Sequence, residues 1–179
     1  MKNNGILRQV AQLGEPVLRK IAVPVSNVEE TRIQQLIDDL LATIKDVHGV
    51  GMAAPQVYES LRIFVVASNP NPRYPNAPKM NPTAVINPEI LSNSKDKEKD
   101  WEGCLSIPGI RGLVPRYKSI RVRFTTRDGK VVEKIYKDFI ARIFQHEFDH
   151  LEGIVFLDRL ESNKDIVSEK EYQKIVTRK

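Results

Sequence analysis

The segment His146-Glu147-Phe148-Asp149-His150 places two histidines four residues apart, with a carboxylate directly after the first. On a helix of about 3.6 residues per turn, His146 and His150 lie one above the other on the same face. Two imidazole nitrogens at this spacing can hold one divalent metal, and Glu147 is close enough to move protons on a metal-bound water. The segment therefore predicts a metal-dependent hydrolase, although two histidines that merely hydrogen-bond in a core would give the same pattern.

The residues around this segment predict a helix over 139–151. Apolar side chains recur on nearly every side of it, including Phe139, Ile143, Phe144 and Leu151. A helix that is apolar nearly all round is buried. We therefore expect it to lie at the centre of the molecule, where it would hold the histidines in an interior of low dielectric.

The rest of the chain predicts strands, loops and two further helices. A capping box at Ser26 and Glu29 opens an amphipathic helix that ends at Gly49. Two short apolar strands and a hairpin are expected, with surface loops between them and a basic helix at the C-terminus. The strands are predicted at 62–67, 83–87, 119–125 and 130–136, the loops at 68–82 (rich in proline) and 95–100 (charged), and the helix at 162–179.

This order of elements indicates an α+β fold, with mostly antiparallel sheets packed around the central helix. The chain has 179 residues, of which 41% are hydrophobic and 28% charged, and this is typical of one globular domain over residues 1–179. The apolar runs are too short for a membrane span, and no secretory signal is apparent. A single cysteine excludes an internal disulfide and, with these absences, predicts a cytoplasmic protein.

A catalytic metal of the zinc type usually takes three protein ligands, so a third must come from outside the histidine helix. No histidine follows His150, and the acidic residues downstream lie in a short tail: Asp158, Glu161, Glu169 and Glu171. Upstream, Glu102-Gly103-Cys104-Leu105-Ser106 offers a cysteine, whose thiolate is a strong ligand. A small buried hydrophobic residue is the alternative interpretation of Cys104.

The segment Gly49-Val50-Gly51-Met52-Ala53-Ala54-Pro55-Gln56 follows the first predicted helix. Small residues allow the backbone to approach a ligand closely, and Gln56 is suited to direct an amide donor at a developing oxyanion. A helix C-cap followed by a tight turn would explain the same residues.

In order and spacing, the three segments together resemble the peptide deformylase family. Its motifs G-x-G-x-A-A-x-Q, E-G-C-x-S and Q-H-E-x-D-H match Gly49 to Gln56, Glu102 to Ser106 and Gln145 to His150. The resemblance extends from about Gly14 to about Leu160. It implies an enzyme that removes the N-terminal formyl group from N-formylmethionyl nascent polypeptides and releases formate.

The resemblance also implies a role for each matched residue. Cys104, His146 and His150 would bind one divalent metal, expected to be Fe²⁺, with Zn²⁺, Ni²⁺ or Co²⁺ able to take its place. A metal-bound water would attack the formyl carbonyl, with Glu147 as general base and then general acid. Gln56 and the backbone N–H of Leu105 would stabilise the oxyanion, and the substrate backbone would be bound by Val50, Gly51 and Gly103.

Two positions depart from the common pattern. Met52 stands where many members carry leucine, a nearly volume-neutral change that we expect to be silent. Arg142 stands where many bacterial members carry an aliphatic residue lining the methionine pocket, and together with the proline-rich loop it resembles the organellar branch. We expect the side chain of Arg142 to lie along the pocket rim with its head in water, and the preference for methionine to survive.

Two other functions compete with this one. A small zinc endopeptidase would use the same histidines with a downstream glutamate, and a non-catalytic ribosome-binding module would carry a structural metal, usually closed by four protein ligands. The net charge of +5 and the basic residues within 162–179 are compatible with transient contact with the ribosome. Neither membrane association nor sequence-specific DNA binding is expected.

Overall fold

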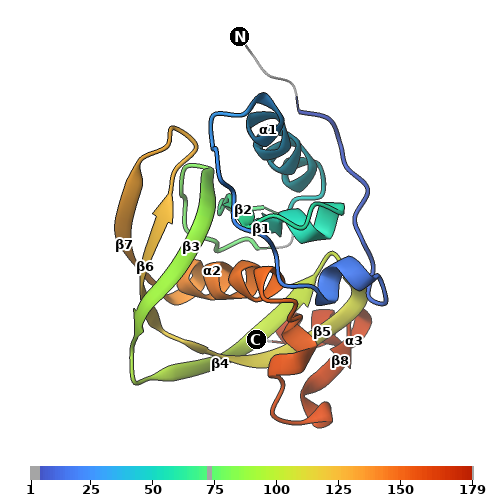
Figure 1. Cartoon of the computed structure of the whole chain (residues 1–179). Helices are drawn as coiled ribbons and strands as arrows, with labels where there is room; N and C mark the ends of the chain where they lie inside the picture. Colours follow the sequence, from blue (N-terminus) through green and yellow to red (C-terminus); the bar gives the residue numbers. More distant parts are fainter. Residues whose placement is uncertain (1–4, 72–73, 179) are drawn as a thin grey trace.

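The computed structural model describes residues 5–71 and 74–178, which form an α+β fold (Figure 1). Three α-helices lie in this part of the chain: α1 (Thr31–Asp46), α2 (Asp138–Leu151) and α3 (Glu169–Thr177). All strand pairing within its two sheets is antiparallel. One sheet has the order β1 (Gly51–Ala53), β2 (Ile63–Val66), β3 (Thr83–Asn93), β6 (Ser119–Thr125) and β7 (Val131–Lys137), and the other has β4 (Lys97–Cys104), β5 (Ile107–Tyr117) and β8 (Ile166–Ser168).

Strand β2 is buried on both faces because a helix covers each of them. Ile63 and Val65 pack with the apolar face of α1, whereas Phe64 and Val66 pack with α2. This explains the unbroken apolar run Ile63-Phe64-Val65-Val66, since a strand with one wet face would alternate. The two helices thereby fix the position of β1, which pairs with β2 and leads into the segment that ends at Gln56.

Helix α2 crosses the middle of the molecule, with β1 and β2 on one side and β4 and β5 on the other (Figure 1). Most of its residues are buried, and these include the polar side chains Arg142, Gln145, Glu147, Asp149 and His150. Helix α2 thus spans Asp138–Leu151, where the sequence predicts a buried helix over 139–151. Its buried polar groups need partners inside the protein, and the neighbouring strands supply most of them.

The hairpin predicted at 119–125 and 130–136 is confirmed as β6 and β7, and the strand predicted at 62–67 as β2. The predicted capping box is wrong: α1 begins at Thr31, and Glu30 at its N-cap makes no side-chain capping bond. Instead, the side chain of Asn27 accepts the backbone N–H of Glu29, which holds a turn ahead of the helix.

One predicted loop and one predicted short strand belong to longer strands in the structure. The charge run at 95–100 was expected to be a loop, but residues from Lys97 onward form β4, whose backbone pairs with β5 while the charged residues 97–100 are exposed. The strand predicted at 83–87 continues to Asn93 past a register shift after Ile86. Strand β5 was not predicted, because it contains Pro108 and Pro115, which disfavour a strand.

The predicted C-terminal helix at 162–179 is only partly correct. Residues Ile166–Ser168 form β8, which pairs with β5, and the helix spans Glu169–Thr177. Lys179 and residues 72–73 of the proline-rich loop lie outside the described residues. Among the described helices, none combines the length and hydropathy required to cross a bilayer.

The central helix yields a stability prediction. Phe144 is fully buried, and its ring meets that of Phe64 edge to face at 4.9 Å between centroids. We expect Phe144→Ala to lower the free energy of unfolding by about 3–5 kcal/mol, measured by urea denaturation, because it leaves a cavity in the core. Ile135→Ala, at a position 63% exposed on β7, should change it by less than about 0.5 kcal/mol. Similar losses in the two variants would contradict this packing.

Candidate metal centre

Three ligand side chains meet between α2 and the end of β4. Sγ of Cys104 and one ring nitrogen each of His146 and His150 lie within 4.8 Å of one another, the only such group in the described part of the chain. Sγ of Cys104 is 3.4 Å from Nε2 of His150. Cys104 and His150 are buried, and the side chain of His146 is 11% exposed. The predicted ligand set is thus brought together by a helix turn and a strand end.

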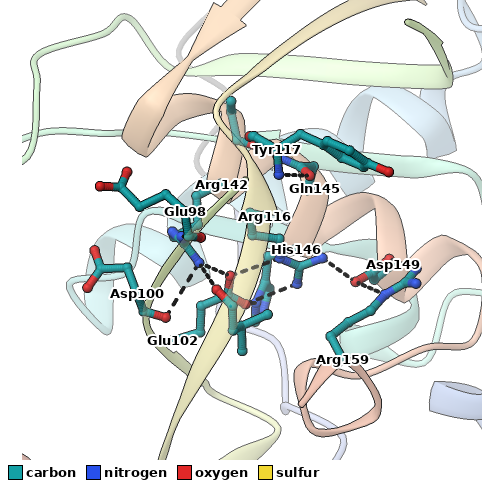
Figure 2. A network of polar contacts seen from close by, with 12 residues as sticks. Glu98, Asp100, Glu102, Arg116, Tyr117, Arg142, Gln145, His146, Asp149 and Arg159 are labelled. Atoms are coloured by element: carbon teal, nitrogen blue, oxygen red, sulfur yellow. Dashed lines mark hydrogen bonds and ion pairs between the residues drawn. The ribbon is translucent and has the colours of Figure 1, made fainter. Parts of the chain in front are cut away.

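The carboxylate of Glu102 links the strand to the helix (Figure 2). Its Oε2 lies 2.9 Å from Nδ1 of His146, so the other ring nitrogen of His146 is turned toward the site. Glu102 and Cys104 lie two residues apart at the end of β4, with a register shift in the pairing with β5 between them, and both side chains are buried. The end of β4 thus places the carboxylate beside His146 and the thiol beside His150.

Two buried arginines neutralise Glu102. Arg116 of β5 donates from Nε and Nη2 to the two carboxylate oxygens, at 2.9 and 3.0 Å, and Nη1 of Arg142 donates at 2.9 Å. Burial alone would raise the pKa of Glu102, but Arg116 and His146 hold it well below its usual range. Arg116 also donates to Asp149, which in turn accepts from Arg159 (Figure 2).

The position of Arg142 corrects an expectation. We expected its head in water at the pocket rim, but the residue is only 8% exposed. Besides Glu102, its guanidinium donates to the backbone carbonyls of Val114 and Glu98, at 2.8 and 2.7 Å. The cause is the unpredicted strand β5, which together with β4 encloses the arginine head. Arg142 still lines the cavity beside the candidate ligands, but its charge is paired with Glu102 inside the protein.

The surroundings favour the thiolate form of Cys104, whereas the imidazole of His146 must release its proton before it can bind a metal. Burial opposes ionisation of the Cys104 thiol, but His150 and His146 lower its pKa well below the ordinary value. Burial likewise opposes the charge on His146, whereas Cys104 and Glu102 raise its pKa. The thiolate is the form of cysteine that binds metals, so the surroundings of Cys104 stabilise its ligating form.

Glu147 is buried next to the ligands and lines the same cavity. Burial raises the pKa of its carboxyl group to about 7. Its Oε1 lies so close to Gly51 that a Cβ there would be 2.3 Å away. A glycine at position 51 is therefore required for β1 and the Glu147 carboxylate to coexist.

Gln56 is held by both ends of its amide. Its Oε1 accepts the backbone N–H of Ala53 at 2.9 Å, which turns Nε2 toward Cys104 Sγ at 3.4 Å and Ser106 Oγ at 3.2 Å. The amide N–H donors of Gln56 thus point at Cys104 and Ser106. Ser106 was part of the matched motif, but its support of Gln56 was not foreseen.

A cavity that is partly open to solvent adjoins these groups. Every predicted site residue lines it except His150, which lies behind Cys104. Of the predicted substrate-binding residues, Val50 directly precedes β1, Gly51 is its first residue and Gly103 lies on β4. Leu105 directly follows β4. Further lining comes from Gly49, Tyr74, Trp101, Phe139, Arg142 and Ile143, of which Tyr74, Trp101 and Phe139 were not predicted. No sequence pattern singles out these aromatic residues, because they are distant along the chain.

The donor set fits a divalent metal with an open position. One thiolate and two imidazoles are suitable ligands for Fe²⁺, Zn²⁺, Ni²⁺ and Co²⁺. Glu147 Oε2 is buried without a protein hydrogen-bond partner among the described residues, which suits a carboxylate that works on a bound molecule. The downstream acids are bound elsewhere: Asp158 to Arg19, Glu161 to Lys99, Glu169 to Arg111 and Glu171 to Lys174. This removes the ligand that an endopeptidase of the usual type would need.

Two known proteins with similar sequences are both named peptide deformylase 2. A peptide deformylase 2 from Nostoc sp. is 55% identical over 175 residues, which is 98% of each chain. A peptide deformylase 2 from Shewanella oneidensis is 45% identical over 150 residues, covering 84% of this chain and 82% of the relative. Both alignments cover more than four fifths of this chain and of the relative, so the similarity is not confined to the motifs.

Solved structures agree with the sequences. The class I type b peptide deformylase from Acinetobacter baumannii with Met-Ala-Ser bound superposes with a TM-score of 0.85 at 47% identity, covering 87% of this chain and 99% of that one. The peptide deformylase from Thermotoga maritima gives 0.78 at 39% identity over 87% and 99%. Residues 7–165 match the family described as Polypeptide deformylase. The chain therefore belongs to the polypeptide deformylase family.

Proposed function

We propose that Cys104, His146 and His150 bind one divalent metal in this deformylase and that Glu147 moves the protons of the reaction. Membership of the family makes the chain a metallohydrolase that removes the N-formyl group from nascent polypeptides. The observation that carries the assignment of residues is the cluster of one sulfur and two nitrogens beside a buried carboxylate without a protein partner.

The bound metal would lower the pKa of a coordinated water toward about 7 and polarise the formyl oxygen. We propose Fe²⁺ as the physiological ion, since the family resemblance implies it, and the same ligands suit Zn²⁺, Ni²⁺ and Co²⁺. The bond from Glu102 to His146 supports this assignment, because ligating histidines usually donate their second nitrogen to such a partner.

Glu147 would act first as a base and then as an acid. As water adds to the formyl carbon, the carboxylate takes its proton, and it returns a proton to the amine nitrogen when the C–N bond breaks and formate leaves. A pKa near 7 suits both steps, because the group can be ionised before the attack and protonated afterwards. Its burial among apolar residues of α2 is the cause of that pKa.

Gln56 and Leu105 would stabilise the negative charge that develops on the formyl oxygen. The Gln56 amide is already oriented by Ala53 and Ser106, so little reorganisation is needed during the reaction. Its Nε2–H donors and the Leu105 backbone N–H, next to Cys104, both border the cavity. These contacts support a two-donor oxyanion site.

The substrate backbone would lie between two strand edges. β1 and β4 each end their sheet and both border the cavity, so an extended peptide can pair with them as an added strand. Val50, Gly51 and Gly103 would supply this pairing. Since the charge of Arg142 is satisfied by Glu102, Val114 and Glu98, its stem contributes apolar surface, and we propose that the methionine preference survives.

The chain would work as one domain over residues 1–179 in the cytoplasm, where nascent chains emerge. We further propose that Lys170 and Lys174 on α3 and Arg178 at its C-cap assist transient contact with the ribosome. All three are exposed, and screening by salt should weaken such a contact.

The central activity prediction uses formate release from formyl-Met-Ala-Ser by anaerobically purified, iron-loaded protein. We expect wild type to release formate from this peptide much faster than from formyl-Asp-Ala-Ser, because the cavity wall is largely apolar and aromatic. Glu147→Gln should lower kcat by about 10²–10⁴-fold, since it removes the proton carrier. The exposed Glu29→Gln should match wild type. Equal rates for the two peptides would refute the methionine preference, and an active Glu147→Gln would refute the role of Glu147.

A second prediction separates this site from that of an ordinary endopeptidase. Cys104→Ser should reduce both metal content, measured by inductively coupled plasma spectrometry, and deformylation, because the hydroxyl is a much poorer ligand than a thiolate. Met52→Leu, at a fully buried position, should retain both. If Cys104→Ser kept its full metal content, Cys104 would not be a ligand.

The ribosome proposal predicts a charge effect. Replacing Lys170, Lys174 and Arg178 together by alanine should weaken co-sedimentation with ribosomes and flatten its dependence on salt. Formate release from the free tripeptide should not change. Salt-independent binding equal to that of wild type would exclude this surface.

A further inference from the structure

Helix α3 packs against the wall of the cavity through Glu169 and Tyr172. The helix lies beside β5 (Figure 1), and both residues follow the range 7–165 that matches the family. Being three residues apart, they lie on the same face of the helix. This contact links the C-terminal segment to residues that would touch substrate.

The first link passes through Arg111 of β5, which is only 3% exposed. Its Nε and Nη2 donate to the two carboxylate oxygens of Glu169, at 2.6 and 3.2 Å, and its guanidinium lies 4.8 Å from the ring centroid of Tyr172. Nη1 donates to the hydroxyl of Tyr74 at 3.4 Å. A fork held on both oxygens has one orientation, so Glu169 fixes where Arg111 lies.

Arg111 in turn touches two parts of the cavity wall. Its side chain lies so close to Gly103 that a Cβ there would be 2.7 Å from Nη1. Tyr74, which it binds, packs its ring 5.6 Å from that of Phe139, and both rings border the cavity. Displacement of Arg111 would therefore remove a hydrogen-bond partner of Tyr74 and open space beside Gly103.

The second link is direct. The ring of Tyr172 meets that of Trp101 in a T-shaped contact with 5.7 Å between centroids, and Trp101 borders the cavity from β4. Edge-to-face aromatic pairs contribute about 0.5–1.5 kcal/mol beyond the area they bury. Without Tyr172, Trp101 would lose this ring contact.

We propose that Glu169 and Tyr172 are positioning residues that hold the aromatic wall of the cavity, Trp101 and Tyr74, and thereby set the affinity for the first side chain of the formylated peptide. This inference rests on the proposed function for its substrate. In the described part of the chain, neither residue lines the cavity that holds Glu147, Cys104 and His146, so they act on binding rather than on proton transfer.

The test compares Tyr172→Ala, Tyr172→Phe and Glu169→Gln in the full-length, iron-loaded protein. Tyr172→Ala should raise KM for formyl-Met-Ala-Ser about two- to tenfold, with kcat within about twofold, and Tyr172→Phe should restore KM because it keeps the ring. Glu169→Gln should raise KM in the same direction. Glu171→Gln on the opposite face of α3, where Glu171 pairs with Lys174, is the matched control and should leave KM unchanged.

A second readout needs no turnover. Trp101 is the only tryptophan of the chain, so its fluorescence reports on the wall alone. Tyr172→Ala should shift its emission to longer wavelength and increase quenching by acrylamide, with Tyr172→Phe and Glu171→Gln as wild type. Titration of zinc-loaded Glu147→Gln protein with formyl-Met-Ala-Ser, followed by Trp101 fluorescence, should give weaker binding when Tyr172→Ala is added.

Unchanged KM and unchanged Trp101 emission in folded Tyr172→Ala and Glu169→Gln would overturn the proposal, as would a fall in kcat without a change in KM. Folding is checked by thermal melting, and the isosteric Glu169→Gln provides the test if Tyr172→Ala does not fold. Failure of the proposed function gives a different result: no formate from wild type, while the Trp101 measurements still decide whether α3 holds the wall.

Discussion

The carboxylate of Glu102 is the contact on which the site depends, because it joins an edge strand to the central helix. It accepts from Arg116, Arg142 and His146 within a buried network (Figure 2). Cys104 lies two residues further along β4, past a register shift in its pairing with β5, and its Sγ is 3.4 Å from Nε2 of His150. The arrangement of the candidate ligands thus depends on a buried carboxylate that joins the end of β4 to α2.

Such a network constrains the fold as well as the site. Buried charges are tolerated when they are paired and fully hydrogen-bonded, and removal of one partner leaves an uncompensated charge that typically costs about 3–5 kcal/mol. Here the pairs run from Arg142 through Glu102 and Arg116 to Asp149 and then to the partly exposed Arg159. The register between α2 and strands β4 and β5 is therefore specified by charge pairing, whereas α1 and β2 are held by apolar packing. The candidate metal ligands lie on β4 and α2, the elements whose register is set by these ion pairs.

The sequence was most informative where a pattern is local. Helix α2 was predicted over 139–151 and spans Asp138–Leu151, since its apolar residues repeat along one segment. Strand β5 was missed because Pro108 and Pro115 disfavour strands locally, and pairing with β4 and β8 overrides that preference. Residue chemistry alone left two interpretations of Cys104 open, a metal ligand or a small buried hydrophobic residue. The order of the three motifs favoured the ligand. The buried head of Arg142 and the wall formed with α3 were beyond prediction, because both depend on strands whose pairing is not written in any single segment.

The central claim is that a strand thiolate and two helix imidazoles form one metal site. X-ray absorption at the zinc edge of the zinc-loaded protein tests it directly, because sulfur and nitrogen ligands differ in both distance and scattering. The account predicts one sulfur at about 2.3 Å and two histidine nitrogens at about 2.0–2.1 Å. A first shell of nitrogen and oxygen alone, without sulfur, would contradict it.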